Sequence, residues 1–123
     1  MTQKALILFA HGARAAGWAA PFERLQQIAS AQLPEVAVRL AFLELMTPQL
    51  PETMAALVAD GRSDITIVPV FLGQGSHLLR DLPLIVDELR TTYPQLQIRV
   101  AAAAGEDPDV LNAIARYCIV SMG

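Results

Sequence analysis

The chain has 123 residues, of which 54% are apolar and 17% charged, and its formal net charge is −3. This composition suits one packed core and is too apolar for a disordered chain. A nucleic-acid-binding surface needs clustered Lys and Arg, and with Lys4 as the only lysine no such basic stripe is formed.

Composition also bears on the compartment. The longest apolar runs, such as residues 5–10 and 65–72, are too short to span a bilayer, and the N-terminal residues lack the pattern of a signal peptide. Cys118 is the only cysteine and cannot form an internal disulfide. We therefore expect a cytoplasmic protein in which residues 1–123 form a single domain.

The first half of the chain alternates between strand and helix patterns. Lys4–Ala10 is a continuous apolar run, typical of a strand buried on both faces. Apolar residues at helical spacing follow and predict one buried stripe: Trp18, Phe22, Leu25, Ala29 and Leu33. A second strand is predicted over Glu35–Leu43. Thr47-Pro48 predicts the N-cap and first position of the next helix, although Pro51 allows a start one turn later.

The second half repeats the alternation. Asp64–Leu72 is the clearest strand, provided that Pro69 occupies a position that needs no N–H donor. Asp81 predicts the N-cap of a third helix that ends at Pro94. Gln97–Ala101 is a shorter fourth strand.

The last helix is predicted to begin at Asp107-Pro108 and to extend to about Val120. Its apolar residues cover more than one face, which is typical of a buried helix. A four-stranded domain cannot bury all of them in one layer, so the helix predicts a subunit interface. A frayed C-terminus rich in alanine is the alternative.

The element order βαβαβαβα predicts an α/β fold with a parallel sheet between two helical layers. Right-handed crossovers restrict the topology to a few flavodoxin-like or Rossmann-like orders. We predict a flavodoxin-like three-layer sandwich with a four-stranded parallel sheet in the order 2-1-3-4.

Ligands of open α/β sheets bind beyond the carboxyl ends of the strands. Both histidines of the chain, His11 and His77, follow predicted strands there, and Glu44 follows another. Two imidazoles and a carboxylate suit a divalent transition metal. No compact ligand motif is present, and two loop histidines that only form hydrogen bonds are the alternative.

Donors for an anionic ligand are predicted at the same edge. The segment Gly73-Gln74-Gly75-Ser76 can turn tightly and offer backbone N–H groups to an anion, and Arg14 can pair with a carboxylate. An ordinary βα turn and a solvated arginine are the alternatives. A serine hydrolase is disfavoured because no GxSxG motif accompanies Ser76, and Cys118 is expected to be a buried, inert thiol.

Three sequence motifs are similar to those of a known family: His11-Gly12-x-Arg14, Ala41-Phe42-Leu43-Glu44, and Phe71-Leu72-x-x-Gly75-x-His77-x-x-x-Asp81-x-Pro83. They resemble the class II chelatases of the sirohydrochlorin type, over nearly the whole chain. The family commonly has Ser where Ala13 stands, so a hydroxyl contact from that position is absent here.

The resemblance implies a chelatase-like domain half the size of the longer chelatases, and a homodimer that builds the cleft. It implies a short cobaltochelatase type of enzyme that inserts Co²⁺, Fe²⁺ or Ni²⁺ into sirohydrochlorin for cobalamin or siroheme. His11 and His77 would handle the metal and Glu44 would assist catalysis; no organic cofactor is expected. A non-catalytic metal carrier and a phosphate- or nucleotide-binding flavodoxin-like module are the alternatives.

Overall fold

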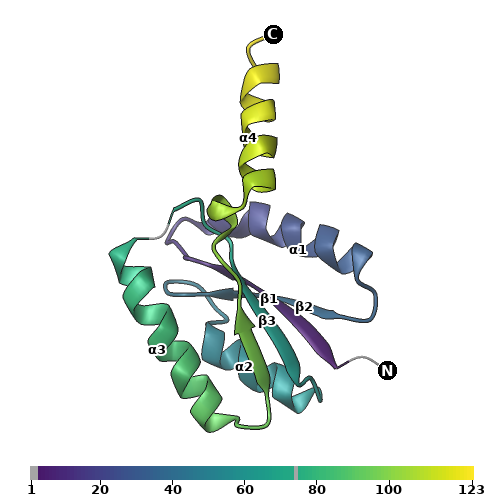
Figure 1. Ribbon diagram of the computed structural model, residues 1–123, viewed down its shortest axis with the longest axis vertical. Helices are drawn as coiled ribbons and strands as arrows, with labels where there is room; N and C mark the ends of the chain where they lie inside the picture. Colours follow the sequence, from purple (N-terminus) through teal and green to yellow (C-terminus); the bar gives the residue numbers. More distant parts are fainter. Residues whose placement is uncertain (1–2, 74) are drawn as a thin grey trace.

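Four parallel strands form the centre of the computed structural model, which describes residues 3–73 and 75–123 (Figure 1). They are β1 (Lys4–Ala10), β2 (Ala37–Phe42), β3 (Asp64–Pro69) and β4 (Gln97–Val100). Their order in the sheet is β2-β1-β3-β4. The predicted α/β fold and strand order are confirmed.

Four α-helices and two short 3₁₀ helices connect or follow the strands. The α-helices are α1 (Ala20–Gln32), α2 (Leu50–Ala59), α3 (Ser76–Thr92) and α4 (Pro108–Val120). The 3₁₀ helices are η1 (Ala16–Ala19) and η2 (Ala104–Glu106).

The carboxyl ends of β2 and β3 lie level with the carboxyl end of β1, their neighbour in the sheet. Ala10, the last residue of β1, pairs with Phe42 on β2, and Phe9 pairs with Pro69 on β3. The predictions of strands over Glu35–Leu43 and Asp64–Leu72 were therefore too long. Pro69 is the last residue of β3, which agrees with a proline that needs no N–H donor in the sheet.

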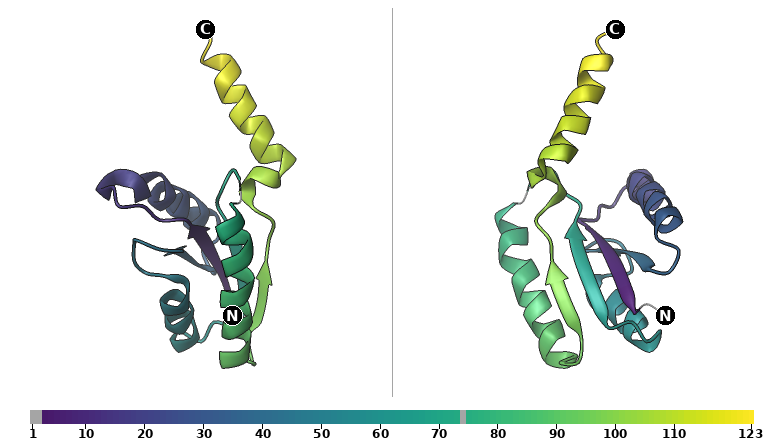
Figure 2. Two further views of the ribbon diagram at one scale, coloured as in Figure 1. Left: turned by 90° about the vertical axis from the view of Figure 1, so that its left-hand side faces the viewer. Right: turned by 45° about the vertical axis from the view of Figure 1, so that its right-hand side comes forward.

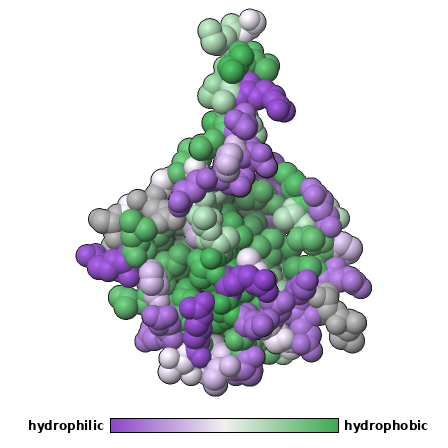
Figure 3. All heavy atoms as spheres, in the orientation of Figure 1, coloured by the Kyte–Doolittle hydropathy of each residue, from purple (hydrophilic) through white to green (hydrophobic). Residues whose placement is uncertain are grey.

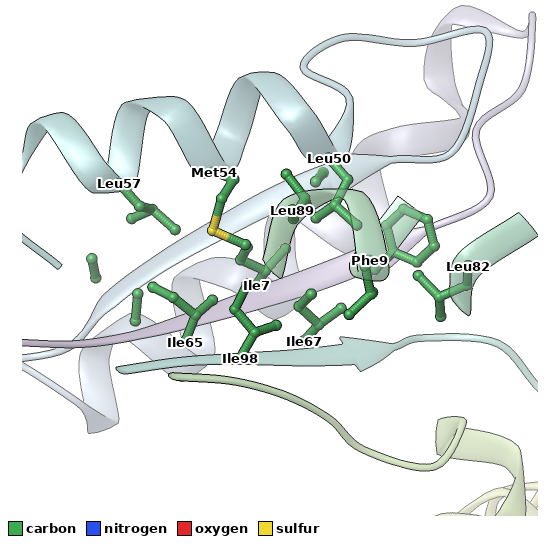
Figure 4. Close-up of a cluster of buried hydrophobic side chains, with 14 of the residues drawn as sticks. Ile7, Phe9, Leu50, Met54, Leu57, Ile65, Ile67, Leu82, Leu89 and Ile98 are labelled. Carbon is green, nitrogen blue, oxygen red and sulfur yellow. The ribbon is translucent and has the colours of Figure 1, made fainter. Parts of the chain in front are cut away.

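One face of the sheet is covered by α2 and α3. Alternate residues of the strands point into this layer and pack against Leu50, Met54 and Leu57 of α2 and against Leu82 and Leu89 of α3 (Figure 4). The strand residues at the centre of this cluster are fully buried: Ile7, Phe9, Ile65 and Ile67. This interlocking core fixes the carboxyl ends of β1 and β3 relative to each other.

The opposite face is covered by α1 over β1 and β2. Leu8, Leu40 and Phe42 are buried there, and the ring of Trp18 stacks at 4.7 Å on that of Phe22. Leu25 and Leu33 are 37% and 38% exposed, so the prediction of one continuous buried stripe was wrong at these two residues.

Two helix starts differ from prediction. The N-cap of α2 is Gln49, which forms a capping box with Glu52, so the later of the two predicted starts is the observed one. Thr47 and Pro48 belong to the preceding loop because the Phe42 N–H donates to the Pro48 carbonyl, 2.9 Å away.

The third helix starts well before Asp81, so the predicted N-cap there was wrong. Gly75 is the N-cap, and the Leu79 N–H donates to its carbonyl at 3.1 Å. Pro83 lies inside the helix, and the carbonyl that it leaves without a donor is that of Leu79, an exposed residue.

The last helix stands away from the rest of the molecule (Figures 1 and 2). Asp107 caps it by accepting a hydrogen bond from the Val110 N–H at 3.2 Å, and its predicted bounds are confirmed. None of its residues is buried. Within residues 3–73 and 75–123, no helix combines the length and apolarity needed to cross a membrane.

Candidate functional site

The carboxyl ends of β1 and β2 bring His11 and Glu44 together. The backbone pairing of the two strands continues past their ends. The Leu43 N–H donates to the Ala10 carbonyl at 2.9 Å, and the Glu44 N–H donates to the His11 carbonyl at 3.1 Å. His11 Nε2 then lies 3.5 Å from Glu44 Oε2, and the two side chains are 45% and 44% exposed. A histidine and a carboxylate thus face solvent side by side.

The spacing of these two groups suits a shared metal ion. Two ligand atoms bound at about 2.0–2.2 Å to one tetrahedral divalent ion lie roughly 3.3–3.6 Å apart. The 3.5 Å between His11 and Glu44 is long for a direct hydrogen bond. The pair can therefore hold a cation between its atoms or relay a proton across a bound ligand.

Gly12 allows the segment after β1 to lie close to the backbone of Glu44. Its φ is +95°, and a Cβ atom at this position would lie 1.8 Å from the Glu44 carbonyl oxygen. In the segment after β2, Leu45 also has a positive φ of 66°, and the Met46 N–H donates to the Glu44 carbonyl at 2.8 Å. Both loops are tight, and Glu44 is held where they meet.

The segment after β3 supplies an aromatic wall. The ring of Phe71 meets His11 edge to face, with centroids 6.1 Å apart and planes at 79°, and meets Phe9 at 6.1 Å and 85°. Edge-to-face packing orients both rings. The sequence indicated an apolar Phe71 but held no signal that it contacts His11.

A backbone hydrogen bond from η2 holds the segment that carries Phe71. The Gly105 N–H donates to the Phe71 carbonyl at 2.7 Å, and a Cβ atom on Gly105 would lie 1.8 Å from the Leu72 carbonyl oxygen. The segments that follow β3 and β4 are thus in close backbone contact at the edge where His11 lies.

His77 belongs to the first turn of α3, which follows β3 at the same edge of the sheet. Its side chain lies outside the part of the structure that is described, as does Gln74. Among the described side chains, no three His, Cys, Asp or Glu gather as a metal cluster. The metal role of His77 therefore stays a prediction.

The other predicted site residues fall at or near this edge. Ser76 is the first residue of α3 and Gly75 its N-cap, so backbone N–H groups of the first helical turn start here. Gly73 and Gly75 have ordinary φ angles, and a Cβ atom at either position would meet nothing within 4 Å. A larger residue would therefore fit at both positions. Arg14 is exposed in the bend after β1.

Two further features lie apart from the histidine and glutamate. Cys118 is exposed on α4, so the expectation of a buried thiol was wrong. A hollow of about 450 Å³ runs along β2 and α1, and residues such as Glu23, Arg39 and Met46 line it, but His11 and Glu44 do not. The candidate site is an open edge with the wall of Phe71 on one side.

Comparisons with known proteins identify the family of the chain. Residues 5–118 match the family model CbiX. The chain is 32% identical over 89 residues to the sirohydrochlorin cobaltochelatase of Methanococcus aeolicus, covering 68% of this chain and 58% of that protein. It is 28% identical over 119 residues to the sirohydrochlorin ferrochelatase of Bacillus subtilis, covering 91% of this chain and 43% of that protein.

A solved structure resembles the whole chain. The crystal structure of a putative cobalamin biosynthesis CbiX protein from Marinobacter aquaeolei superimposes with a TM-score of 0.82 at 29% identity, and the match covers 97% of both chains. The chain spans about half the length of the curated relatives that it matches. By the match over residues 5–118, the chain belongs to the CbiX family.

Proposed function

We propose that this chain inserts a divalent metal into sirohydrochlorin, with Co²⁺ as the first candidate and Fe²⁺ or Ni²⁺ as the alternatives. The observation that carries the proposal is the pair of His11 and Glu44, 3.5 Å apart at the ligand-binding edge of the sheet. The names of the relatives, a cobaltochelatase and a ferrochelatase of sirohydrochlorin, supply the reaction and the substrate.

Each predicted residue has a role in this reaction. Insertion replaces two pyrrole N–H protons by one M²⁺ ion, so the protein must deliver the metal and remove protons. His11 and His77 bind the metal through neutral imidazoles. Glu44 accepts a pyrrole proton, since its carboxylate is half exposed beside His11; the second proton passes to solvent.

Anionic groups of the substrate need donors at the same edge. Arg14 is exposed in the bend after β1 and would pair with a carboxylate of the macrocycle. The backbone N–H groups of the segment Gly73, Gln74, Gly75 and Ser76 would hold another, at the start of α3.

A second copy of the chain is part of the proposal. The Bacillus subtilis ferrochelatase is more than twice as long as the segment that this chain matches, which covers 43% of it, and His11 and Glu44 are both about half exposed at the edge of the sheet. Two copies would enclose the macrocycle between their edges. The cytoplasmic location proposed for this reaction rests on the composition of the sequence.

The test is a metallation assay. Purified protein is mixed with Co²⁺ and sirohydrochlorin, and the absorbance change of the tetrapyrrole is followed against a protein-free control. We expect acceleration above that control, and its loss in His77→Ala. A protein that binds Co²⁺ without accelerating insertion would be a metal carrier, which would reject the proposed activity.

A further inference from the structure

The loop that follows β2 contains a strained turn directly after Glu44. The Met46 N–H donates to the Glu44 carbonyl at 2.8 Å, and Leu45 between them has a φ of 66°. A hydrogen bond that spans a single residue of positive φ belongs to the rarer, strained form of the γ-turn. A side chain costs energy in this conformation, whereas glycine adopts it freely. The turn would therefore be more stable with glycine than with the leucine that it contains.

The side chain of Leu45 contributes little to the core. It is 51% exposed, and in the described part of the chain it belongs to neither of the two buried hydrophobic clusters. Its neighbours differ, because Leu43 packs against the cluster beneath α2 and α3 and Met46 packs against the cluster beneath α1. These two residues anchor the loop on opposite faces of the sheet, and Leu45 lies between them beside Glu44.

Leu72 has a corresponding place in the segment after β3. It is 66% exposed, and its carbonyl oxygen would lie 1.8 Å from a Cβ atom on Gly105, so its backbone is held against η2. Since β1 lies between β2 and β3 in the sheet, the segments that carry Leu45 and Leu72 flank the segment that carries His11. Figure 3 also shows a hollowed, largely hydrophobic area below the base of α4, but these two leucines belong to the loops at the carboxyl edge.

We propose that Leu45 and Leu72 hold the apolar face of the tetrapyrrole over His11 and Glu44. The assignment rests on the proposed function, because it concerns the substrate of that reaction. The conjugated ring of a tetrapyrrole is flat and apolar, and its carboxylates lie on the periphery. Small-molecule sites combine apolar contacts of this kind with a few polar groups that fix the orientation of the ligand. The two leucines supply the apolar contacts next to the residue that accepts a pyrrole proton.

Contact with the ring also explains why the strained turn contains leucine. Strained backbone persists at ligand sites because the strain is part of how the site works, and a conflict between residue and backbone marks such sites. Glycine would relax the turn, but it offers no methyl groups to a ligand. The ring would cover the half of the Leu45 side chain that is exposed, and removal of this apolar surface from water stabilises the complex.

Equilibrium binding of metal-free sirohydrochlorin to the full chain tests the assignment. The absorbance of the tetrapyrrole is titrated with wild type, Leu45→Ala, Leu45→Gly and Leu72→Ala. We expect each variant to raise the dissociation constant by about fivefold to tenfold, as for the loss of a leucine contact that is partly buried. Leu84→Ala, 62% exposed on α3, is the matched control and should bind as wild type does. An unchanged dissociation constant in Leu45→Ala or in Leu72→Ala would overturn the assignment.

Urea denaturation separates the side chain of Leu45 from its backbone. Leu45→Ala keeps a Cβ atom and with it the strain, whereas Leu45→Gly removes both. We expect Leu45→Gly to unfold at a higher urea concentration than wild type and Leu45→Ala at a concentration no higher. Glycine would then stabilise the chain while it weakens binding of the tetrapyrrole. If Leu45→Gly unfolds at a lower urea concentration than wild type, Leu45 serves stability, and its assignment to the ligand is overturned.

Sedimentation of each variant accompanies the titration, because an exposed leucine can also contact a second copy of the chain. Weaker binding of sirohydrochlorin with the oligomeric state of the wild type supports direct contact with the ring. Weaker binding that occurs only together with a changed oligomeric state overturns direct contact.

Failure of this assignment can be told apart from failure of the chelatase activity, since metal-free binding requires no turnover. A chain that binds sirohydrochlorin through both leucines without accelerating metallation supports the assignment and rejects the activity. A chain that accelerates metallation, with unchanged binding in the leucine variants, rejects the assignment alone. A wild-type chain that binds no sirohydrochlorin overturns both.

Discussion

His11 Nε2 and Glu44 Oε2 lie 3.5 Å apart, although they follow different strands of the sheet. Backbone hydrogen bonds that extend the β1–β2 pairing by two residues hold them there. The side chains are thus positioned by the sheet itself rather than by a flexible loop.

Glu44→Gln keeps the shape of the side chain and removes its ability to accept a proton. We expect the rate of Co²⁺ insertion into sirohydrochlorin to fall by about 100-fold, with a much smaller change in the Co²⁺ dissociation constant. Stopped-flow absorbance and calorimetric titration give the two quantities. Glu35→Gln, an exposed glutamate before β2, is the matched control. Equal losses of rate and affinity would instead make Glu44 a metal ligand.

Gly12→Ala forces a Cβ atom against the Glu44 carbonyl oxygen at a φ of +95°. Because backbone atoms cannot yield cheaply, we expect the free energy of unfolding to fall by at least about 2 kcal/mol. Urea denaturation measures it. At Gly17 a Cβ meets nothing within 4 Å and the φ is ordinary, so Gly17→Ala should change stability by less than about 1 kcal/mol. Similar results for both variants would show that the close approach at Gly12 is not formed.

Phe71→Leu removes the edge-to-face contacts with His11 and Phe9. We expect a loss of about 1 kcal/mol in stability and a Co²⁺ affinity lowered by roughly tenfold, as for other groups that orient a metal ligand. Phe22→Leu, which loses a ring contact with Trp18 on the other sheet face, should lower stability alone. Unchanged Co²⁺ affinity in Phe71→Leu would contradict an orienting role.

Arg62 joins three segments at the opposite edge of the sheet. It donates to the carbonyls of Lys4 at 3.2 Å and Glu35 at 3.0 Å and to the Asp60 carboxylate at 3.0 Å. Arg62→Ala should lower the free energy of unfolding by about 1–3 kcal/mol and leave Co²⁺ affinity unchanged. Arg24→Ala, exposed on α1, should do neither. A changed Co²⁺ affinity in Arg62→Ala would mean that the edge of the sheet near Arg62 is coupled to the edge that carries His11.

The sheet could be predicted because its pattern is local. Continuous apolar runs mark strands buried on both faces, and right-handed crossovers leave few orders for four of them. The bounds of β2 and β3 could not be predicted, because they depend on how far β1 extends beside them. The start of α3 was missed because Asp81 and Pro83 look like a helix start, whereas Gly75 is the residue that caps it.

The candidate site could be predicted only as a set of residues that share an edge. Sequence order places His11 and Glu44 after adjacent strands, but their 3.5 Å distance depends on the positive φ of Gly12 and Leu45. The contact of Phe71 with His11 depends on the path of the chain after β3, where the Val70 N–H donates to the Phe9 carbonyl at 2.8 Å. The sequence predicted that one domain cannot bury all the apolar residues of the last helix, but it could not show that none of them is buried within its own chain.

The central claim is that His11 and His77 bind one metal ion together. X-ray absorption of the Co²⁺-loaded protein, combined with a Co²⁺ titration, tests it in the wild type and in His11→Ala and His77→Ala. We predict a single Co²⁺ per chain whose imidazole scattering decreases in each variant, with a large loss of affinity in both. Wild-type affinity and an unchanged scattering pattern in either variant would contradict the claim.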